Sequence, residues 1–138
     1  MEIRIAKGSD IDRVYALRYE VFVNEQNVPS EIELDDEDKH ALHIIAEENG
    51  AEVGCARVLF GEGGGHIGRL AVKREKREQG IGKEICRFII ELCRERVYKR
   101  VWLNSQLHAV GCYEKLGFTR RGETFFEAGI EHVEMELI

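Results

Sequence analysis

Apolar residues along this chain follow two periods, and these separate the expected strands from the expected helices. Short alternating or continuous apolar runs predict strands over residues 2–6, 41–48, 51–60, 66–72, 101–104, 118–126 and 130–137. Helical spacing predicts helices from Ser9 to about Asn24, from 80 to 97 and from 107 to 116. This order indicates a mixed α/β (α+β) domain, in which helices flank a twisted sheet of about seven strands.

Turn signals support several of these bounds. Asn49-Gly50 stands between two apolar runs and predicts a tight hairpin. Gly61–Gly65 predicts a flexible turn, and Gly117 follows a helix at the position where a left-handed residue ends one. Ser9 followed by Asp12 resembles a capping box.

Length and composition narrow the class of protein. A chain of 138 residues that is 43% hydrophobic forms one domain, residues 1–138, with a core that needs neither disulfides nor metal. Its net charge of −6 argues against a nucleic-acid binder. The four cysteines lack C-x-x-C spacing, which predicts reduced and mostly buried thiols and no metal site. No secretory signal and no membrane-spanning apolar run is found, so we expect a cytoplasmic protein without membrane contact.

One short stretch is basic although the chain is acidic. Residues 72–83 carry five Lys and Arg residues against Glu75 and Glu78, and they include the run Arg77-x-x-Gly80-x-Gly82-Lys83 between a strand and a helix. Glycines lack Cβ atoms that would hold an anion away, and the free N–H groups and dipole of a helix start attract negative charge. The run therefore predicts a phosphate site, although alone it is equally typical of a basic turn.

Two other glycine motifs lack the neighbouring elements or residues that their usual functions require. Gly63-x-Gly65-x-x-Gly68 has dinucleotide-fingerprint spacing, but it leads into a strand where that fingerprint opens a helix. The run at 80–83 suggests a phosphate-binding Walker loop, yet Arg77 replaces its first glycine and Glu84 its Ser or Thr. Neither a dinucleotide enzyme nor a nucleotide hydrolase is indicated.

Three motifs taken together resemble the GNAT superfamily of acyl-CoA-dependent acetyltransferases. They are Leu70-Ala71-Val72, the R-x-x-G-x-G run and Tyr113-Glu114-Lys115-Leu116-Gly117-Phe118. The segment Arg18–Gln26, with the acidic stretch and His43 after it, is similar to the small, largely uncharacterised ElaA and YjcF branch. This resemblance implies the GNAT fold and acetyl transfer from acetyl-CoA to a primary amine of a small molecule or peptide, directly in a ternary complex.

The resemblance also implies where the cofactor lies. Main-chain groups of Leu70, Ala71 and Val72 would pair with the pantetheine, and Asn104 would face the slot for the thioester. The pyrophosphate would be held by backbone amides of Arg77, Glu78, Gln79, Gly80, Ile81, Gly82 and Lys83. Glu78 departs from the family, where glycine is frequent, and it must face solvent because an inward carboxylate would repel phosphate. Cys112 replaces an aromatic residue, which either enlarges the acceptor pocket or is simply repacked.

Tyr113 is the residue expected to carry chemistry. A phenol held beside the sulfur can protonate the departing thiolate, while an amide of residues 70–72 stabilises the oxyanion. The general base is open among groups able to accept a proton: Glu25, Asp38, His40, His43 and His108. Of these, Glu25 and His43 are kept as candidates.

Residues 31–38 form an acidic stretch with six carboxylates, and two interpretations of it remain. It attracts a cationic acceptor such as a polyamine, an aminoglycoside or a lysine side chain, or it is a solvated loop. The function also has alternatives: a non-catalytic acyl-CoA sensor on the same fold, or an acyl-homoserine-lactone synthase, a family that generally lacks the R-x-x-G-x-G loop. A homodimer is possible because dimers are common among relatives.

Overall fold

The computed structural model describes residues 1–138, which form one seven-stranded mixed sheet in the order β1-β2-β3-β4-β5-β7-β6. Its strands are β1 (Glu2–Ile5), β2 (Leu42–Glu48), β3 (Ala51–Gly61), β4 (Gly64–Val72), β5 (Val101–Gln106), β6 (Thr119–Glu127) and β7 (Ile130–Leu137). The helices are α1 (Asp10–Arg18), α2 (Ser30–Glu33), α3 (Ile81–Glu95) and α4 (Val110–Lys115). The expected α/β fold with about seven strands in a single domain is confirmed.

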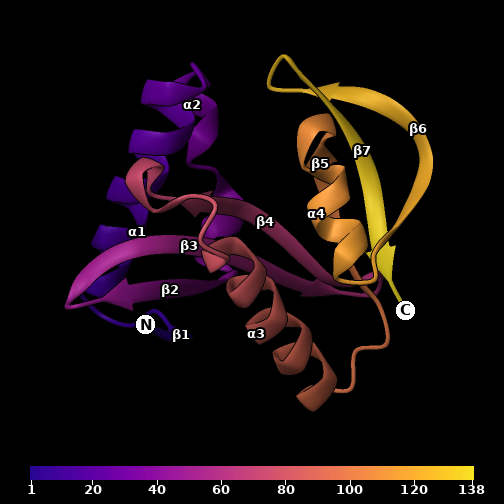
Figure 1. Ribbon diagram of the computed structural model, residues 1–138, viewed down its shortest axis with the longest axis horizontal. Coiled ribbons are helices and arrows are strands. Elements are labelled where there is room, and N and C mark those ends of the chain that lie inside the picture. The colour runs from indigo at the N-terminus through magenta and orange to yellow at the C-terminus, as the bar shows by residue number, and fades with distance from the viewer.

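Every neighbouring pair of strands is antiparallel except β4 and β5, and that parallel pair is short. Pairing runs from Gly65 opposite Val101 to Ile67 opposite Leu103 and then stops. Beyond it the two halves of the sheet diverge, as Figure 1 shows for β4 against β5 and β7. The β5-facing edge of residues 68–72 is therefore left without a strand partner.

A bulge bends β4 where this divergence begins. Cys55 pairs with Ala71 and Arg57 with Gly68, so Arg69 and Leu70 together oppose the single residue between Cys55 and Arg57. Arg69 adopts a positive φ of 52°. Such a bulge increases local twist and redirects side chains, here at the edge that parts from β5.

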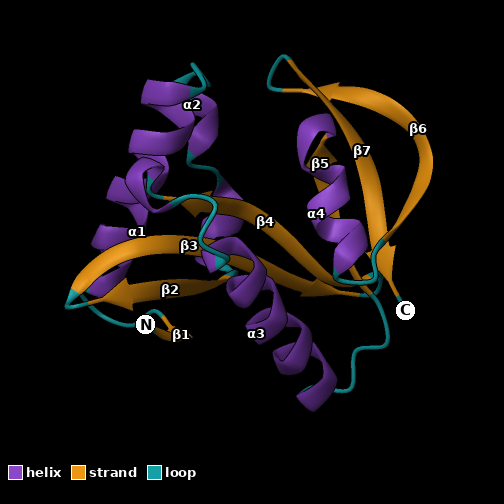
Figure 2. Ribbon diagram, viewed as in Figure 1, coloured by secondary structure: helices purple, strands orange, loops and turns teal.

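The helices cover the two faces of the sheet and make two separate cores (Figure 2). The amphipathic α3 packs Ile81, Ile85 and Ile89 against one face, in a cluster that continues to Val133 and Met135 of β7. On the other face α1 packs against β2, β3 and β4 through a smaller cluster that includes Val14 and Leu17. The β5 and β7 part of that second face is the one that remains open to a cavity.

Local sequence signals predicted two turns together with the residues that form them. Asn49 and Gly50 join β2 to β3 with φ angles of 54° and 79°, as a tight two-residue hairpin requires. Gly117, at φ 100°, ends α4: its N–H donates to Glu114 O, and the Phe118 N–H donates to Tyr113 O. These two bonds form a Schellman motif.

Other expected bounds were wrong. The first helix starts at Asp10 without a side-chain cap from Ser9, and after Arg18 it continues as a π-helical segment, Tyr19–Glu25. The expected turn at 61–65 shrinks to two residues because β3 and β4 pair as far as Gly61 and Gly64. The segment 107–116 is a 3₁₀ turn (Leu107–Ala109) followed by α4. The expected loop at 31–40 contains α2 and a 3₁₀ turn, Asp36–Lys39.

Candidate active site

The start of α3 presents a set of backbone donors that the protein itself does not use. The N–H groups of residues 78–83 donate to no protein acceptor, and the first bond of the helix runs from Glu84 N–H to Gly80 O. Gly80 takes a φ of 84°, which opens the helix with a left-handed residue. Free donors at a helix start are a ready site for an anion.

Two charged side chains flank these donors. Arg77 Nε donates to Val72 O over 3.0 Å, which ties the R-x-x-G-x-G run to the end of β4. Its two Nη atoms each lie 2.8 Å from an oxygen of Glu25, and this bidentate pair lowers the pKa of Glu25. Glu78 is exposed and has a φ of 64°, a left-handed conformation that favours glycine.

The unpaired edge of β4 lies beside this helix start. A Cβ atom added to Gly82 would lie 3.7 Å from Val72 Cγ2 and 4.0 Å from Leu70 Cδ2. Leu70 and Val72 are half-buried and Ala71 is buried against α1. An open strand edge that leads to free amide donors can hold an elongated ligand with an amide-rich stem and an anionic end.

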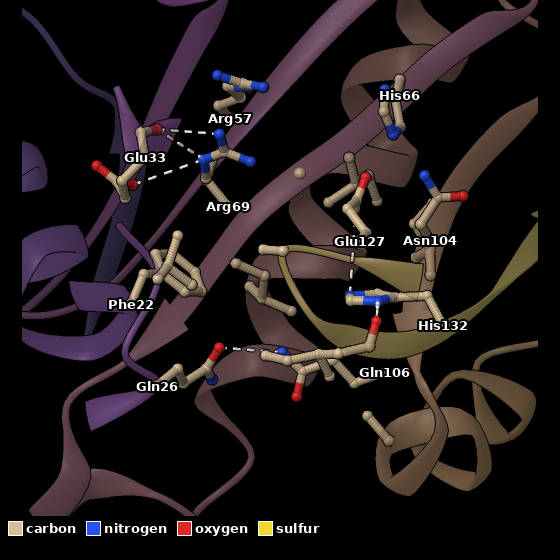
Figure 3. A pocket seen from close by; sticks show the side chains of 18 of the residues that line it. Phe22, Gln26, Glu33, Arg57, His66, Arg69, Asn104, Gln106, Glu127 and His132 are labelled. Atoms are coloured by element: carbon tan, nitrogen blue, oxygen red, sulfur yellow. Dashed lines mark hydrogen bonds and ion pairs between the residues drawn. The ribbon is translucent and has the colours of Figure 1, made fainter. Parts of the chain in front are cut away.

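A cavity of about 450 Å³ opens where β4 and β5 part. Figure 3 shows its two walls, with Glu33, Arg57 and Arg69 on one and Asn104 and His132 on the other. Phe22 of the π-helical segment and Gln26, the residue that follows it, also line the cavity, and α4 contributes Tyr113. Asn104 and Tyr113, both expected at the site from sequence, thus lie in one cavity although they come from different elements.

Tyr113 lines this cavity with a buried phenol. Burial raises the pKa of its hydroxyl, with smaller contributions from Cys86 and Cys112 and none from a hydrogen bond. The ring packs edge-on against Phe118 at 6.0 Å between centroids. The phenol therefore stays protonated across neutral pH and has a proton to give. Cys112 itself is exposed and does not line the cavity.

Three histidines line the cavity: His66, His108 and His132. His66 stacks on Trp102 at 3.7 Å, and burial together with Arg57 and other arginines lowers its pKa to about 4. His108 is exposed, and its Nε2 lies 2.8 Å from Gln106 Oε1, while Gln106 donates to Gln26 over 3.1 Å. His132 is buried on β7 and was missed by the sequence reasoning. Its only sequence signal was a place on the polar face of an alternating strand.

The general-base candidates from the sequence lie elsewhere. Glu25 pairs with Arg77 and does not line the cavity. His43 is buried on β2, with Nε2 3.0 Å from Asp38 O and its ring edge-on to Tyr15, and it too lies outside the cavity. Asp38 is fully engaged with arginines, and His40 is exposed away from the cavity. Only His108 of the five shares the cavity with Tyr113.

The far wall of the cavity belongs to a set of ion pairs that we call the arginine cluster: Arg18, Arg57, Arg69, Glu33, Asp35 and Asp38. Of these, Glu33, Asp35, Arg57 and Arg69 line the cavity, and Arg18 and Asp38 lie behind them. Arg18 is fully buried and donates to Glu33 and Asp38 over 2.7 Å each. Burial alone would raise the pKa of Asp38, but hydrogen bonds led by that from Arg18 hold it at about 2. Three carboxylates of the acidic stretch are therefore occupied by arginines, so the expectation of a simply solvated loop was wrong for them.

Fold and site together define an acyltransferase of the GNAT type, and comparison with known proteins agrees. The model of the acetyltransferase (GNAT) domain matches residues 9–138, so the chain belongs to this family. No helix of the structure is long and apolar enough to span a membrane.

Among similar proteins, the uncharacterised N-acetyltransferase YjcF of Bacillus subtilis is 33% identical over 98% of both chains. The crystal structure of Escherichia coli ElaA superposes with a TM-score of 0.89 at 28% identity, covering 99% of each chain. The fold also matches an aminoglycoside 6'-N-acetyltransferase solved with coenzyme A, with a TM-score of 0.78 at 15% identity over 99% of this chain and 96% of that one. The expected resemblance to the ElaA and YjcF branch is confirmed.

Proposed function

We propose that this protein uses acetyl-CoA to acetylate a primary amine of a small molecule or peptide. The observation that carries the proposal is the continuity of three features: the unpaired edge of residues 68–72, the free amides of 78–83 and the cavity with Tyr113. An elongated thioester with a phosphate end fits the order in which these three features follow one another in space.

The residues present fit each part of coenzyme A. Main-chain groups of Leu70, Ala71 and Val72 would pair with the amide-bearing pantetheine, and the amides from Glu78 to Lys83 would hold the pyrophosphate beside the Arg77 side chain. Asn104 would face the acyl end. Glu78 is exposed, and its carboxylate must point away from the pyrophosphate in this arrangement, because it would otherwise repel it.

Bound acetyl-CoA supplies a thioester carbonyl that an amine can attack. An amide of residues 70–72 stabilises the charge that develops on the carbonyl oxygen, and Tyr113 donates its hydroxyl proton to the departing sulfur. Direct transfer needs both substrates together, and the divergence of β4 from β5 gives the acceptor a way to the carbonyl from the cavity side.

Binding and turnover are tested separately. Calorimetry with coenzyme A and with acetyl-CoA should detect binding of both, and free thiol should then accumulate when acetyl-CoA is mixed with a panel of amines. Absence of heat with either ligand contradicts the proposal. Binding without thiol release with any amine supports instead the non-catalytic sensor, for which the same fold and donors suffice.

A further inference from the structure

His132 lines the cavity and differs from the two other cavity histidines in its burial and its hydrogen bond. It lies on β7, opposite Gln106 of β5 and Phe125 of β6. Its neighbour in the chain, Val133, points to the core, so alternation turns the imidazole to the other face, where it lines the cavity. Figure 3 shows it on the same wall as Asn104. Only 7% of the residue is exposed.

The hydrogen bond of one ring nitrogen fixes the state of the other. Nδ1 lies 2.7 Å from the carbonyl oxygen of Ile130. A carbonyl oxygen can only accept, so Nδ1 carries the hydrogen and Nε2 keeps its lone pair. Nε2 is 3.7 Å from Glu127 Oε2, too far for a hydrogen bond but close enough for the carboxylate to stabilise a positive ring. The imidazole is thus oriented, with a basic nitrogen free.

The other cavity histidines are less suited to accept a proton. Burial and the neighbouring arginines oppose protonation of His66, whose ring is also held flat on Trp102. His108 is exposed and its Nε2 is engaged with Gln106. His132 alone is buried, oriented by a backbone bond and adjacent to a carboxylate.

We propose that His132 is the catalytic base that deprotonates the acceptor amine, an inference that rests on the acetyltransferase function proposed above. Nε2 takes one proton from the ammonium form of the acceptor, and the neutral amine forms the C–N bond as the C–S bond breaks. Tyr113 gives its proton to the sulfur, and the phenolate recovers one from the new amide nitrogen. The imidazolium releases its proton to solvent, so the net products are the acetamide, the free thiol and one proton.

The charges that face His132 fit this role. From β6 comes the Glu127 carboxylate, and from β5 the uncharged Gln106 and Asn104. The 3₁₀ turn Leu107–Ala109 contributes His108, and α4 contributes Tyr113. The opposite wall contributes His66, Glu37 and the arginine cluster. The cluster's arginines are paired with its carboxylates, and Glu127 is the charged group that lies beside the imidazole, with Oε2 3.7 Å from Nε2.

The test compares His132→Asn with the wild-type protein. The Asn amide retains a donor where Nδ1 meets the Ile130 carbonyl but has no base at the Nε2 position. We expect kcat at neutral pH to fall by about 10²–10³, the usual range for a base, with the Kd for coenzyme A unchanged. The deficit should shrink as pH rises, because a larger share of the amine is then deprotonated by solvent. His40→Asn, an exposed histidine outside the cavity, should behave as wild type.

Each outcome of this test decides the assignment. A kcat within about two-fold of wild type, or a deficit equal at every pH, overturns it. The assignment is also overturned if the kcat deficit that shrinks with rising pH is found in His108→Asn and not in His132→Asn. If His132→Asn does not fold by circular dichroism, His132→Gln, which places an amide near the Nε2 position, is measured in its place. Failure of the wild type to release thiol with any amine overturns the acetyltransferase function itself, which is a distinct result.

Discussion

At the scale of single residues, Tyr113 depends on its surroundings for its expected chemistry. Burial in the wall of the cavity raises the pKa of the phenol, so the group stays protonated around neutral pH. The sequence identified the residue through the Y-E-K-L-G-F run. The structure adds the reason for its protonation state.

Replacing Tyr113 by Phe removes the proton donor and little else. We expect kcat to fall by about 10²–10³, within the range for general acid catalysis, with coenzyme A affinity unchanged. Single-turnover thiol release and calorimetry measure the two quantities. Tyr98→Phe, a matched change in a ring that stacks on Phe60 outside the cavity, should leave both unchanged. Unaltered turnover in Tyr113→Phe removes this tyrosine from the mechanism.

At the scale of elements, two glycines at the start of α3 have different reasons to be glycine. Gly80 needs its positive φ to open the helix. Gly82 has an ordinary helical φ, and a Cβ atom there would meet only side-chain atoms of Val72 and Leu70 at normal contact distances. The fold therefore accounts for Gly80 but not for Gly82. The close approach of a ligand to the free amides, as in the proposed function, would account for the second.

Gly82→Ala separates folding from binding. We expect an equal or higher melting temperature, because Ala is favoured over Gly in helices by up to about 1 kcal/mol. The added methyl group should raise the Kd for coenzyme A by about ten-fold or more, or about 1.4 kcal/mol. Gly61→Ala, at a strand end with no neighbour within 4 Å, is the control and should bind as wild type. Equal affinity in both variants would mean that the amides at 78–83 do not hold the ligand.

At the scale of the whole molecule, the arginine cluster joins segments that lie far apart in the chain. Arg18 ends α1, Arg57 is in β3, Arg69 is in β4 and Asp38 belongs to the 3₁₀ turn before β2. Asp38 accepts hydrogen bonds from Arg18, Arg57 and the Asp35 N–H. The cluster holds residues 30–39 against the sheet and so forms one wall of the cavity.

Asp38→Asn should destabilise the fold by about 3–5 kcal/mol, because it leaves buried arginines without their shared carboxylate. Urea unfolding followed by circular dichroism measures this loss. Asp36→Asn, an exposed residue of the same turn that makes no ion pair, should change stability by less than about 0.5 kcal/mol. Similar losses in the two variants would show that the cluster contributes little.

The lowered pKa of Asp38 makes the free energy of unfolding depend on pH. The pKa of Asp38 is about 2 in the folded state, below the ordinary aspartate value of 3.8. Because the folded pKa is the lower one, its ionised form stabilises the fold above about pH 4, and this contribution disappears as pH falls towards 2. The stability difference between wild type and Asp38→Asn should therefore shrink between pH 5 and about 2. A difference independent of pH would contradict the assignment.

The sequence by itself determined the order of the strands, the hairpin at Asn49-Gly50, the cap at Gly117 and the glycine at which α3 opens, because each depends on residues that are neighbours in the chain. Only the tertiary structure decided that the acidic stretch pairs with three arginines, that Glu25 engages Arg77 and that His132 shares a cavity with Tyr113. These contacts join residues distant in sequence. Their formation depends on where β4 separates from β5, which no local pattern encodes.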